Sequence, residues 1–261
     1  MENTLISIGV FRGERLLFHS AVSTDKDRTA DEYSIIFRDL LSLHRVPCAS
    51  IQDAILASVV RPLNETLTQA IGQLFNIKPL LVGPGVKTGL DIKTDMPSQV
   101  GADLVANAVG ALSLTVPPLV IIDLGTATTL TAINNKWELC GVMICPGVRS
   151  SLDALSAKTT ELPGIDLYLP RHLLGRNTID AMLSGVIYGH AAMIDGLLDR
   201  ITDEWNNKTL MVLATGTFAE KIIPHCRVDH TIRTEPNLTL MGLLRIFQQN
   251  DRRKAEGKPG T

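Results

Sequence analysis

The residues best suited to chemistry in this sequence follow an apolar run in the string PLVIIDLGTATTLTAI. Asp123 stands at the carboxyl end of the run, and Gly125, Thr126, Thr128 and Thr129 come directly after it. Backbone N–H groups and hydroxyls at a tight turn suit phosphate oxygens. A carboxylate beside them could hold a cation that balances the charge of a nucleotide. A threonine-rich hairpin at a sheet edge explains the same string equally well.

Asp103 is a second candidate. Apolar residues of VGADLVANAVGAL recur at helical spacing, and Asp103 and Asn107 share the opposite face of that helix. In a functional interpretation Asp103 is a general base that takes a proton from an attacking alcohol, because phosphoryl transfer needs a positioned nucleophile more than covalent help. In a structural interpretation it is an acid that favours the first turn of a helix.

Two further strings place polar residues where helices are expected to start. In GRNTIDAML, Asn177 is an expected N-cap with Asp180 three residues on, and Thr178 could donate to a substrate carboxylate or amide. The string ATGT at 214–217 joins an expected strand to a helix, where adenosine or phosphate could approach closely. A plain strand-to-helix turn fits that string as well.

The string GPGVKTG has the look of a nucleotide-binding loop. A Walker A loop needs glycine immediately before the lysine, and Val86 occupies that place. We therefore expect a glycine-rich connector here.

Composition narrows the function classes. A 45% share of hydrophobic residues over 261 positions supplies a sizeable core, so a globular protein is expected. The net charge is −2 and the longest basic run is the short DRRK near the end, so nucleic acid is not an expected partner.

Cysteine spacing and the first residues indicate the compartment. The four cysteines match neither a zinc site nor a disulfide framework, and we expect buried thiols in a reducing environment. The start MENTLISIGVF lacks a basic region, and no apolar stretch is expected to approach the roughly 20 residues that cross a bilayer. A cytoplasmic protein that is neither secreted nor inserted in a membrane is expected.

Hydrophobic periodicity predicts an α/β protein. In the first half it predicts a β-hairpin (5–11 and 15–21), helices (29–43, 64–75 and 100–114), strands (54–60 and 79–82) and a loop (83–97). In the second half it predicts strands (118–124, 130–133, 139–144 and 210–214) and helices (177–201 and 238–248). Because each half opens with a hairpin, we expect a duplicated α/β unit, with domains at 1–116 and 117–250, a ligand cleft between them, and a frayed polar tail at 251–261.

Taken together, these strings resemble the type III pantothenate kinases of the acetate-and-sugar-kinase/actin superfamily. The resemblance covers roughly residues 3–243 and rests on GPGVKTGL, VGAD with Asn107, IDLGTATT, CGVMICPGV, GRNT with the following SG, ATGTFAE and PNLTLMGL. It implies two actin-like (ribonuclease H-like) domains. It also implies ATP-dependent phosphorylation of the terminal hydroxyl of pantothenate to 4'-phosphopantothenate, the first step of coenzyme A biosynthesis.

The resemblance also implies roles for individual residues. Asp103 would be the general base, and Asp123 would bind a monovalent cation, K+ or NH4+, in an enzyme that uses ATP with Mg2+. The remaining implied contacts are to ATP (Asn3, Thr4 and Thr126), to pantothenate (Gly101, Ala102 and Leu104), and to pantothenate from the partner subunit of a homodimer (Thr178).

The sequence departs from the family pattern at its start. These kinases begin with an apolar strand leading into Asp-x-Gly-Asn-Thr. Here Asn3 and Thr4 match the last two residues, Glu2 stands in place of the glycine, and the aspartate position precedes Met1. Without that strand, its neighbours in the sheet would be left unpaired. Either the true reading frame starts upstream or the chain is an altered homologue, and the intact remainder of the hairpin favours the first alternative.

The second departure is Leu104, where the family motif Gly-x-Asp-Arg supplies arginine. A guanidinium would bind the pantothenate carboxylate through hydrogen bonds worth about 1.5–3 kcal/mol each, and leucine supplies none. Two hypotheses therefore stay open. The chain is a kinase for pantothenate or a related hydroxy acid, or it is a catalytically impaired homologue that acts as a nucleotide-binding or regulatory protein.

Overall fold

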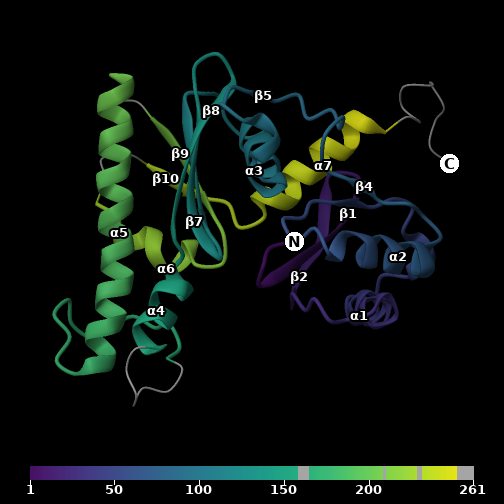
Figure 1. Cartoon of the computed structure of the whole chain (residues 1–261), viewed down its shortest axis with the longest axis horizontal. Coiled ribbons are helices and arrows are strands. Elements are labelled where there is room, and N and C mark those ends of the chain that lie inside the picture. The colour runs from purple at the N-terminus through teal and green to yellow at the C-terminus, as the bar shows by residue number, and fades with distance from the viewer. Residues whose placement is uncertain (158–164, 208–209, 228–230, 252–261) are drawn as a thin grey trace. The chain divides into compact units, whose positions relative to one another are not determined.

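The computed structural model describes residues 1–157, 165–207, 210–227 and 231–251. The chain forms two compact units (Figure 1). Unit 1 contains Met1–Leu90, Met96–Ser113 and the described residues from Asn237 on, and unit 2 contains Asp91–Asp95 and Leu114–Pro236. Most of the expected polar tail, at 252–261, lies outside the described residues.

These units differ from the continuous halves 1–116 and 117–250 that the sequence led us to expect. The C-terminal helix α7 (Leu238–Asn250) belongs to unit 1, where it packs on α3 (Ala102–Leu112). The backbones approach closely because a Cβ on Gly110 would come within 2.5 Å of the Leu238 carbonyl oxygen, and a Cβ on Gly242 would clash with the Ala106 carbonyl oxygen. Conversely, β5 (Asp91–Ile92) belongs to unit 2 although the residues on both sides of 91–95 belong to unit 1. It pairs in parallel with β8 (Glu138–Pro146).

Unit 1 contains two separate two-stranded sheets. The expected hairpin is confirmed as the antiparallel pair β1 (Leu5–Arg12) and β2 (Arg15–Ser23). The second sheet pairs β3 (Ile55–Leu56) in parallel with β4 (Leu80–Leu81), so each of the strands expected at 54–60 and 79–82 is paired over only two residues. The remaining elements of the unit are two α-helices and two 3₁₀ turns: α1 (Ala30–Leu43), α2 (Leu63–Phe75), Cys48–Ser50 and Pro97–Gln99.

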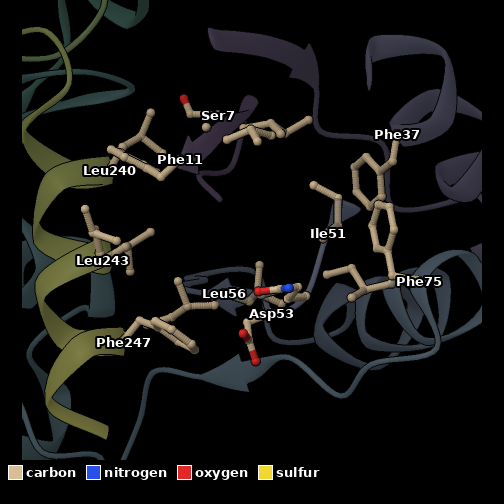
Figure 2. A pocket seen from close by; sticks show the side chains of 18 of the residues that line it. Ser7, Phe11, Phe37, Ile51, Asp53, Leu56, Phe75, Leu240, Leu243 and Phe247 are labelled. Carbon is tan, nitrogen blue, oxygen red and sulfur yellow. The ribbon is translucent and has the colours of Figure 1, made fainter. Parts of the chain in front are cut away.

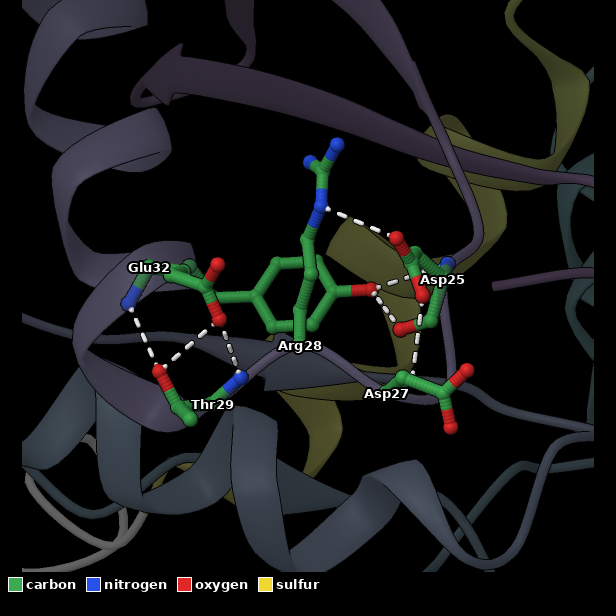
Figure 3. Close-up of polar contacts among 6 residues, drawn as sticks. Asp25, Asp27, Arg28, Thr29 and Glu32 are labelled. Atoms are coloured by element: carbon green, nitrogen blue, oxygen red, sulfur yellow. Dashed lines mark hydrogen bonds and ion pairs between the residues drawn. The ribbon is translucent and has the colours of Figure 1, made fainter.

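The start of α1 shows why its sequence folds as a helix. Thr29 is the N-cap: its Oγ1 accepts from the Glu32 backbone N–H at 3.3 Å, while its own N–H donates to the Glu32 carboxylate at 2.7 Å (Figure 3). This capping box satisfies two backbone donors that the first helical turn leaves free. The same backbone hydrogen bond holds the pKa of Glu32 below its ordinary value. Tyr33 fixes the preceding loop by donating its hydroxyl to the Asp25 carbonyl at 2.7 Å.

Unit 2 is built on one six-stranded sheet with the order β10-β9-β6-β7-β8-β5. The central strand β6 pairs antiparallel with β7 and parallel with β9; β7 and β8 are antiparallel, and β9 and β10 are parallel. The strand bounds are β6 (Leu119–Leu124), β7 (Ala127–Ile133), β8 (Glu138–Pro146), β9 (Met211–Thr215) and β10 (Ile232–Thr234).

Helices cover one face of this sheet (Figure 1). Val120, Ile122 and Leu124 of β6 lie in one buried cluster with residues of α4 (Val148–Ala157) and α5 (Thr178–Trp205). We expected no apolar stretch near the length that crosses a membrane, and α5 contradicts this. By length and composition alone, α5 is long and apolar enough to cross one. Its apolar side chains, among them Leu183, Ile194 and Leu198, are instead buried against the sheet. The unit also contains α6 (Ala219–Ile222) and the 3₁₀ turn Ile223–His225.

All four cysteines are free and partly buried. Burial raises the pKa of the Cys226 thiol to about 12, and the neighbouring Asp195 carboxylate acts in the same direction. Burial also raises the pKa of Cys140. We expected buried thiols, and the structure shows that none of the four is fully buried.

Candidate functional site

Asp103 lies in the first turn of α3, where Gly101 is the N-cap and supplies no side-chain cap. Its carboxylate folds back over Gly101, because a Cβ built on that glycine would clash with Asp103 Oδ1. Gly101 therefore makes room for the carboxylate. Oδ1 is buried and has no hydrogen-bond partner among the described residues. A buried acceptor of this kind is costly unless a donor reaches it, so the position suits a ligand hydroxyl.

The amino terminus lies near this carboxylate. The Met1 ammonium donates to the Ala57 carbonyl oxygen at 2.6 Å. Burial lowers the pKa of the ammonium, while the negative charges of Glu2 and Asp103 act in the opposite direction. Asp103 is thus part of a charged group of residues within unit 1.

The neighbours of Asp103 on α3 have different surroundings. Leu104, at the position where the family motif has arginine, is 8% exposed and packs as a core residue. Asn107 is 1% exposed, and its Oδ1 accepts from Thr239 Oγ1 of α7 at 2.6 Å. Asn107 therefore helps to join two helices, whereas the carboxylate of Asp103 has an atom left for a ligand.

In unit 2, Asp123 lies in a row of polar side chains across the sheet. It pairs with Thr129 on β7 and with Thr215 on β9, so the three share the face opposite to α4 and α5. Thr129 Oγ1 is buried without a hydrogen-bond partner among the described residues. The expected turn at 125–129 is shorter than predicted, since β7 already begins at Ala127.

Two glycines allow the backbone to close around that turn. A Cβ on Gly147 would clash with the Thr126 carbonyl oxygen and lie 3.0 Å from the Gly125 carbonyl oxygen. A Cβ on Gly216, whose φ is +94°, would lie 2.5 Å from Asp123 Oδ1 and 2.6 Å from the Leu124 amide nitrogen. The sequence places Gly216 in the candidate string ATGT at 214–217, but it predicts no contact of either glycine with this turn. Their role depends on contacts 21 and 93 residues away from Thr126 and Asp123 (147 − 126 and 216 − 123).

The groups around this turn fit the cations and phosphates that the sequence implies. Asp123 and the Gly125 and Thr126 carbonyl oxygens are hard oxygen ligands of the kind that K+ or Mg2+ prefers, and the Thr129 hydroxyl is a free donor for a phosphate oxygen. Within the described ranges there is no cluster of three or more His, Cys, Asp or Glu side chains that could hold a metal ion.

The other predicted site residues lie at chain turns and helix starts. Asn3 and Thr4 are exposed between Met1 and β1, where the Thr4 carbonyl oxygen accepts from the Thr24 backbone N–H at 2.9 Å. Thr178 is exposed at the first residue of α5, directly after the Asn177 N-cap, whose side chain accepts from the Asp180 N–H at 2.8 Å. The structure therefore brings Gly101, Ala102, Asp103 and Leu104 together in unit 1, and Asp123 and Thr126 together in unit 2.

Comparison with known proteins identifies the family. A family model described as type III pantothenate kinase matches residues 1–200. The chain belongs to the type III pantothenate kinase family. A family member from an Exiguobacterium species is 40% identical over 251 residues, which is 96% of this chain and 97% of the relative. Another, from Moorella thermoacetica, is 40% identical over 248 residues, which is 95% of this chain and 96% of the relative.

Two solved structures have a fold similar to that of this chain. The activator of 2-hydroxyisocaproyl-CoA dehydratase from Clostridium difficile superposes with a TM-score of 0.57 at 14% identity, over 100% of this chain and 97% of that one. The ethanolamine utilization protein EutJ from Carboxydothermus hydrogenoformans superposes with a TM-score of 0.56 at 13% identity, over 94% and 87%. These likenesses confirm the expected α/β fold.

Proposed function

We propose that this protein is a cytoplasmic kinase that transfers the γ-phosphoryl group of ATP to the terminal hydroxyl of pantothenate and so forms 4'-phosphopantothenate. The single observation that carries the proposal is the 40% identity to type III pantothenate kinases along nearly the whole of both chains. The local geometry of Asp103 and of Thr129 on β7 supports it, because Asp103 Oδ1 and Thr129 Oγ1 are buried without a hydrogen-bond partner among the described residues.

In this proposal Asp103 acts as the general base. Its buried Oδ1 accepts the proton of the substrate hydroxyl as the oxygen attacks the γ-phosphorus, and the bond from that phosphorus to the bridging oxygen of ADP breaks. Thr126 and the backbone around it bind the phosphates of ATP. Asn3 and Thr4 are further ATP contacts in this proposal. Gly101 and Ala102 line the substrate pocket beside Asp103.

Two cations fit the unit 2 turn in this proposal. Mg2+ bound to ATP would neutralise charge on the phosphates, and a monovalent cation, K+ or NH4+, would be held by Asp123 with main-chain oxygens. The Gly147 and Gly216 contacts support this role, because the missing Cβ atoms let the main chain pack close to the Asp123 carboxylate and the Thr126 carbonyl oxygen.

A homodimer is part of the proposal, with Thr178 reaching the pantothenate of the partner subunit. Two observations support it. Thr178 is exposed within its own chain, and the segment just before it carries a group of exposed apolar side chains. That group, which we call the 168–174 patch, consists of Tyr168, Leu169, Leu173 and Leu174. Exposed apolar groups of this kind are typical of interfaces.

The test is a coupled kinase assay with the purified chain over a panel of hydroxy acids that includes pantothenate, with and without potassium. Asp103→Asn should lose at least about a thousandfold in kcat, because the variant has no base of comparable strength at that position. Asp31→Asn is a matched control, since Asp31 occupies the same second position of α1 and is exposed. It should keep full activity.

Turnover of Asp103→Asn equal to that of the parent protein would rule out the assigned base. If the parent chain binds ATP and turns over no member of the panel, the second hypothesis holds instead. The replacement of arginine by the buried Leu104 is the observation that favours a nucleotide-binding homologue without this activity, or a kinase with a different hydroxy acid as substrate.

A further inference from the structure

A polar side chain interrupts the buried face of α5. His190 is 7% exposed, and Val186 and Ile194, four residues before and after it, belong to the apolar cluster that α5 buries against the sheet. An imidazole ring in such surroundings is costly unless its nitrogens are hydrogen-bonded. The ring therefore needs partners, and the structure supplies two main-chain carbonyl oxygens.

The two ring nitrogens of His190 face different parts of the chain. Nδ1 lies 2.7 Å from the Val186 carbonyl oxygen, which belongs to α5 itself. Nε2 lies 3.2 Å from the carbonyl oxygen of Pro146, the last residue of β8 and 44 residues away in the sequence. A neutral ring donates through one nitrogen and a protonated ring through both. A proton on Nε2 therefore decides whether the ring joins α5 to the end of β8.

The end of β8 lacks a main-chain donor. Pro146 pairs with Ala127 of β7, and proline has no N–H to give to the ladder. The Ala127 carbonyl oxygen accepts from the Gly125 N–H at 3.1 Å, within the turn that joins β6 to β7. A hydrogen bond from His190 to the Pro146 carbonyl oxygen thus holds the strand end at the position where the ladder loses a donor.

Gly147 links Pro146 to the turn between β6 and β7. It follows Pro146 directly, and a Cβ on it would clash with the Thr126 carbonyl oxygen. Ser150, in the first turn of α4, donates its hydroxyl to the same carbonyl oxygen at 3.1 Å. All of these residues belong to unit 2. A displacement of the strand end would therefore move the groups against which the turn packs.

We propose that His190 is a positioning residue for phosphate binding. Its Nε2–H donates to the Pro146 carbonyl oxygen, fixes the end of β8 against α5, and so holds the turn at 125–126 in the shape that binds the phosphates of ATP. The contact with ATP rests on the proposed function, whereas the hold on the turn is a property of the free protein. The effect is expected on ATP and not on pantothenate, because the residues assigned to pantothenate on α3 lie in unit 1.

Three substitutions of His190 separate the hydrogen bond from the packing. His190→Gln keeps a donor for the Pro146 carbonyl oxygen, because its amide nitrogen takes the place of Nε2. His190→Asn keeps a donor only at the place of Nδ1, and His190→Leu fills the space without a donor. Ile194→Val is the control on the same face of α5, since it removes a buried methyl group and no hydrogen bond.

A second control lies in unit 1. Phe37→Leu removes ring atoms from the wall of a cavity of about 470 Å³, which Phe37 and Phe75 line together (Figure 2). This variant should have a lower thermal midpoint and an unaltered turn in unit 2. It therefore shows how much of any effect comes from a loss of stability alone.

The first measurement is amide hydrogen exchange of the free protein in peptides that cover residues 124–130. We expect exchange there to be about tenfold faster in His190→Asn and His190→Leu than in the parent chain, and within about threefold of the parent in His190→Gln and in both controls. Nitrogen NMR of the histidine rings should show a proton on Nε2 of His190. Unchanged exchange, an Nε2 without a proton, or a His190→Gln variant as fast as His190→Leu would overturn the proposal. Equally fast exchange in Ile194→Val would do the same.

The second measurement is the dissociation constant for ATP, by calorimetry. It should rise about tenfold in His190→Asn and His190→Leu, while the KM for pantothenate at saturating ATP stays within about twofold of the parent value. Faster exchange with an unchanged dissociation constant would refute the role in phosphate binding. A parent chain that binds no ATP would refute the proposed function, and the exchange data would still decide whether His190 holds the turn.

Discussion

At the scale of single residues, two glycines allow the main chain to pack closely against Asp123 and Thr126. Gly216 lies in the left-handed region and its missing Cβ leaves room for the Asp123 carboxylate, while Gly147 leaves room for the Thr126 carbonyl oxygen. The threonines and Asp123 bring the polar atoms, and the glycines decide how closely the main chain packs around them. The site thus depends on residues that contribute no functional group of their own.

Gly147→Ala tests that view. The added methyl group has to push the 125–126 turn away, so we expect the KM for ATP to rise about tenfold while the fold is kept. Gly141→Ala is the control, because Gly141 lies in β8, the strand that ends directly before Gly147, and a Cβ there would meet no atom within 4 Å. Steady-state kinetics with varied ATP measures both variants. Equal KM values in Gly147→Ala and Gly141→Ala would contradict the role given to the turn.

The polar residues of α3 show what helical periodicity can and cannot predict. Helical spacing correctly puts Asp103 and Asn107 on one helix, but it cannot distinguish them. Asn107 accepts from Thr239, 132 residues further along the chain, whereas Asp103 Oδ1 has no such partner. Only the tertiary contact of α3 with α7 separates a structural amide from a candidate base. Periodicity carries no information about a contact that distant.

At the scale of elements, helices with strong local signals were predictable, whereas the two-residue extent of β3 and β4 and the existence of β5 were not. The expected helix at 29–43 agrees with α1 because its capping box is local, and the expected helix at 177–201 agrees with α5 for the same reason. Helix α4, with the sequence VRSSLDALSA, was missed because its apolar residues are few, and β5 was missed inside an expected loop. Strands of two or three residues exist only through pairing partners elsewhere in the chain.

The capping box of α1 gives a prediction at this scale. Thr29→Ala should lower the free energy of unfolding by about 1 kcal/mol, because a cap of the first helical turn is lost. Chemical denaturation at pH 7 measures it. Because the folded state holds the pKa of Glu32 below its ordinary value, the carboxylate contributes stability above its unfolded pKa, and this contribution is lost as pH falls. In Glu32→Gln that pH-dependent part should disappear; an unchanged profile would contradict the capping role.

The packing of α3 against α7 gives a second prediction at the scale of elements. Gly242→Ala should destabilise the protein by about 1–3 kcal/mol, since a Cβ there clashes with the Ala106 carbonyl oxygen and forces the helices apart. Gly72→Ala is the control within the same unit: Gly72 is also helical, but a Cβ there would lie 3.7 Å from the Ile77 carbonyl oxygen, an ordinary contact. If the two variants unfold at the same denaturant concentration, the close helix crossing is not what holds α7 in unit 1.

At the scale of the whole molecule, the chain is an α/β protein made of two compact units that are not continuous in sequence. The structure agrees with the duplication that the sequence predicts, since both units contain an antiparallel hairpin and a parallel strand pair. The sequence does not reveal that α7 belongs to unit 1 and β5 to unit 2. Each of these elements contacts a partner that is more than 40 residues away in the sequence. The 168–174 patch belongs to this scale as well, since its leucines are exposed in the part of the chain that the structure describes.

Leu174→Asp tests whether a second copy covers that patch. Leu174 is 83% exposed, so the carboxylate costs nothing in an isolated chain, whereas burying it in an apolar interface would be costly. We expect the variant to sediment as a monomer where the parent protein is a dimer. Its KM for pantothenate should rise, because Thr178 of the partner subunit would no longer reach the substrate. Leu43→Asp is the matched control: Leu43 is 73% exposed on α1, in the other unit, and its replacement should leave both the sedimentation and the KM unchanged. A Leu174→Asp dimer with unaltered KM would place the subunit contact elsewhere and would remove Thr178 from the pocket.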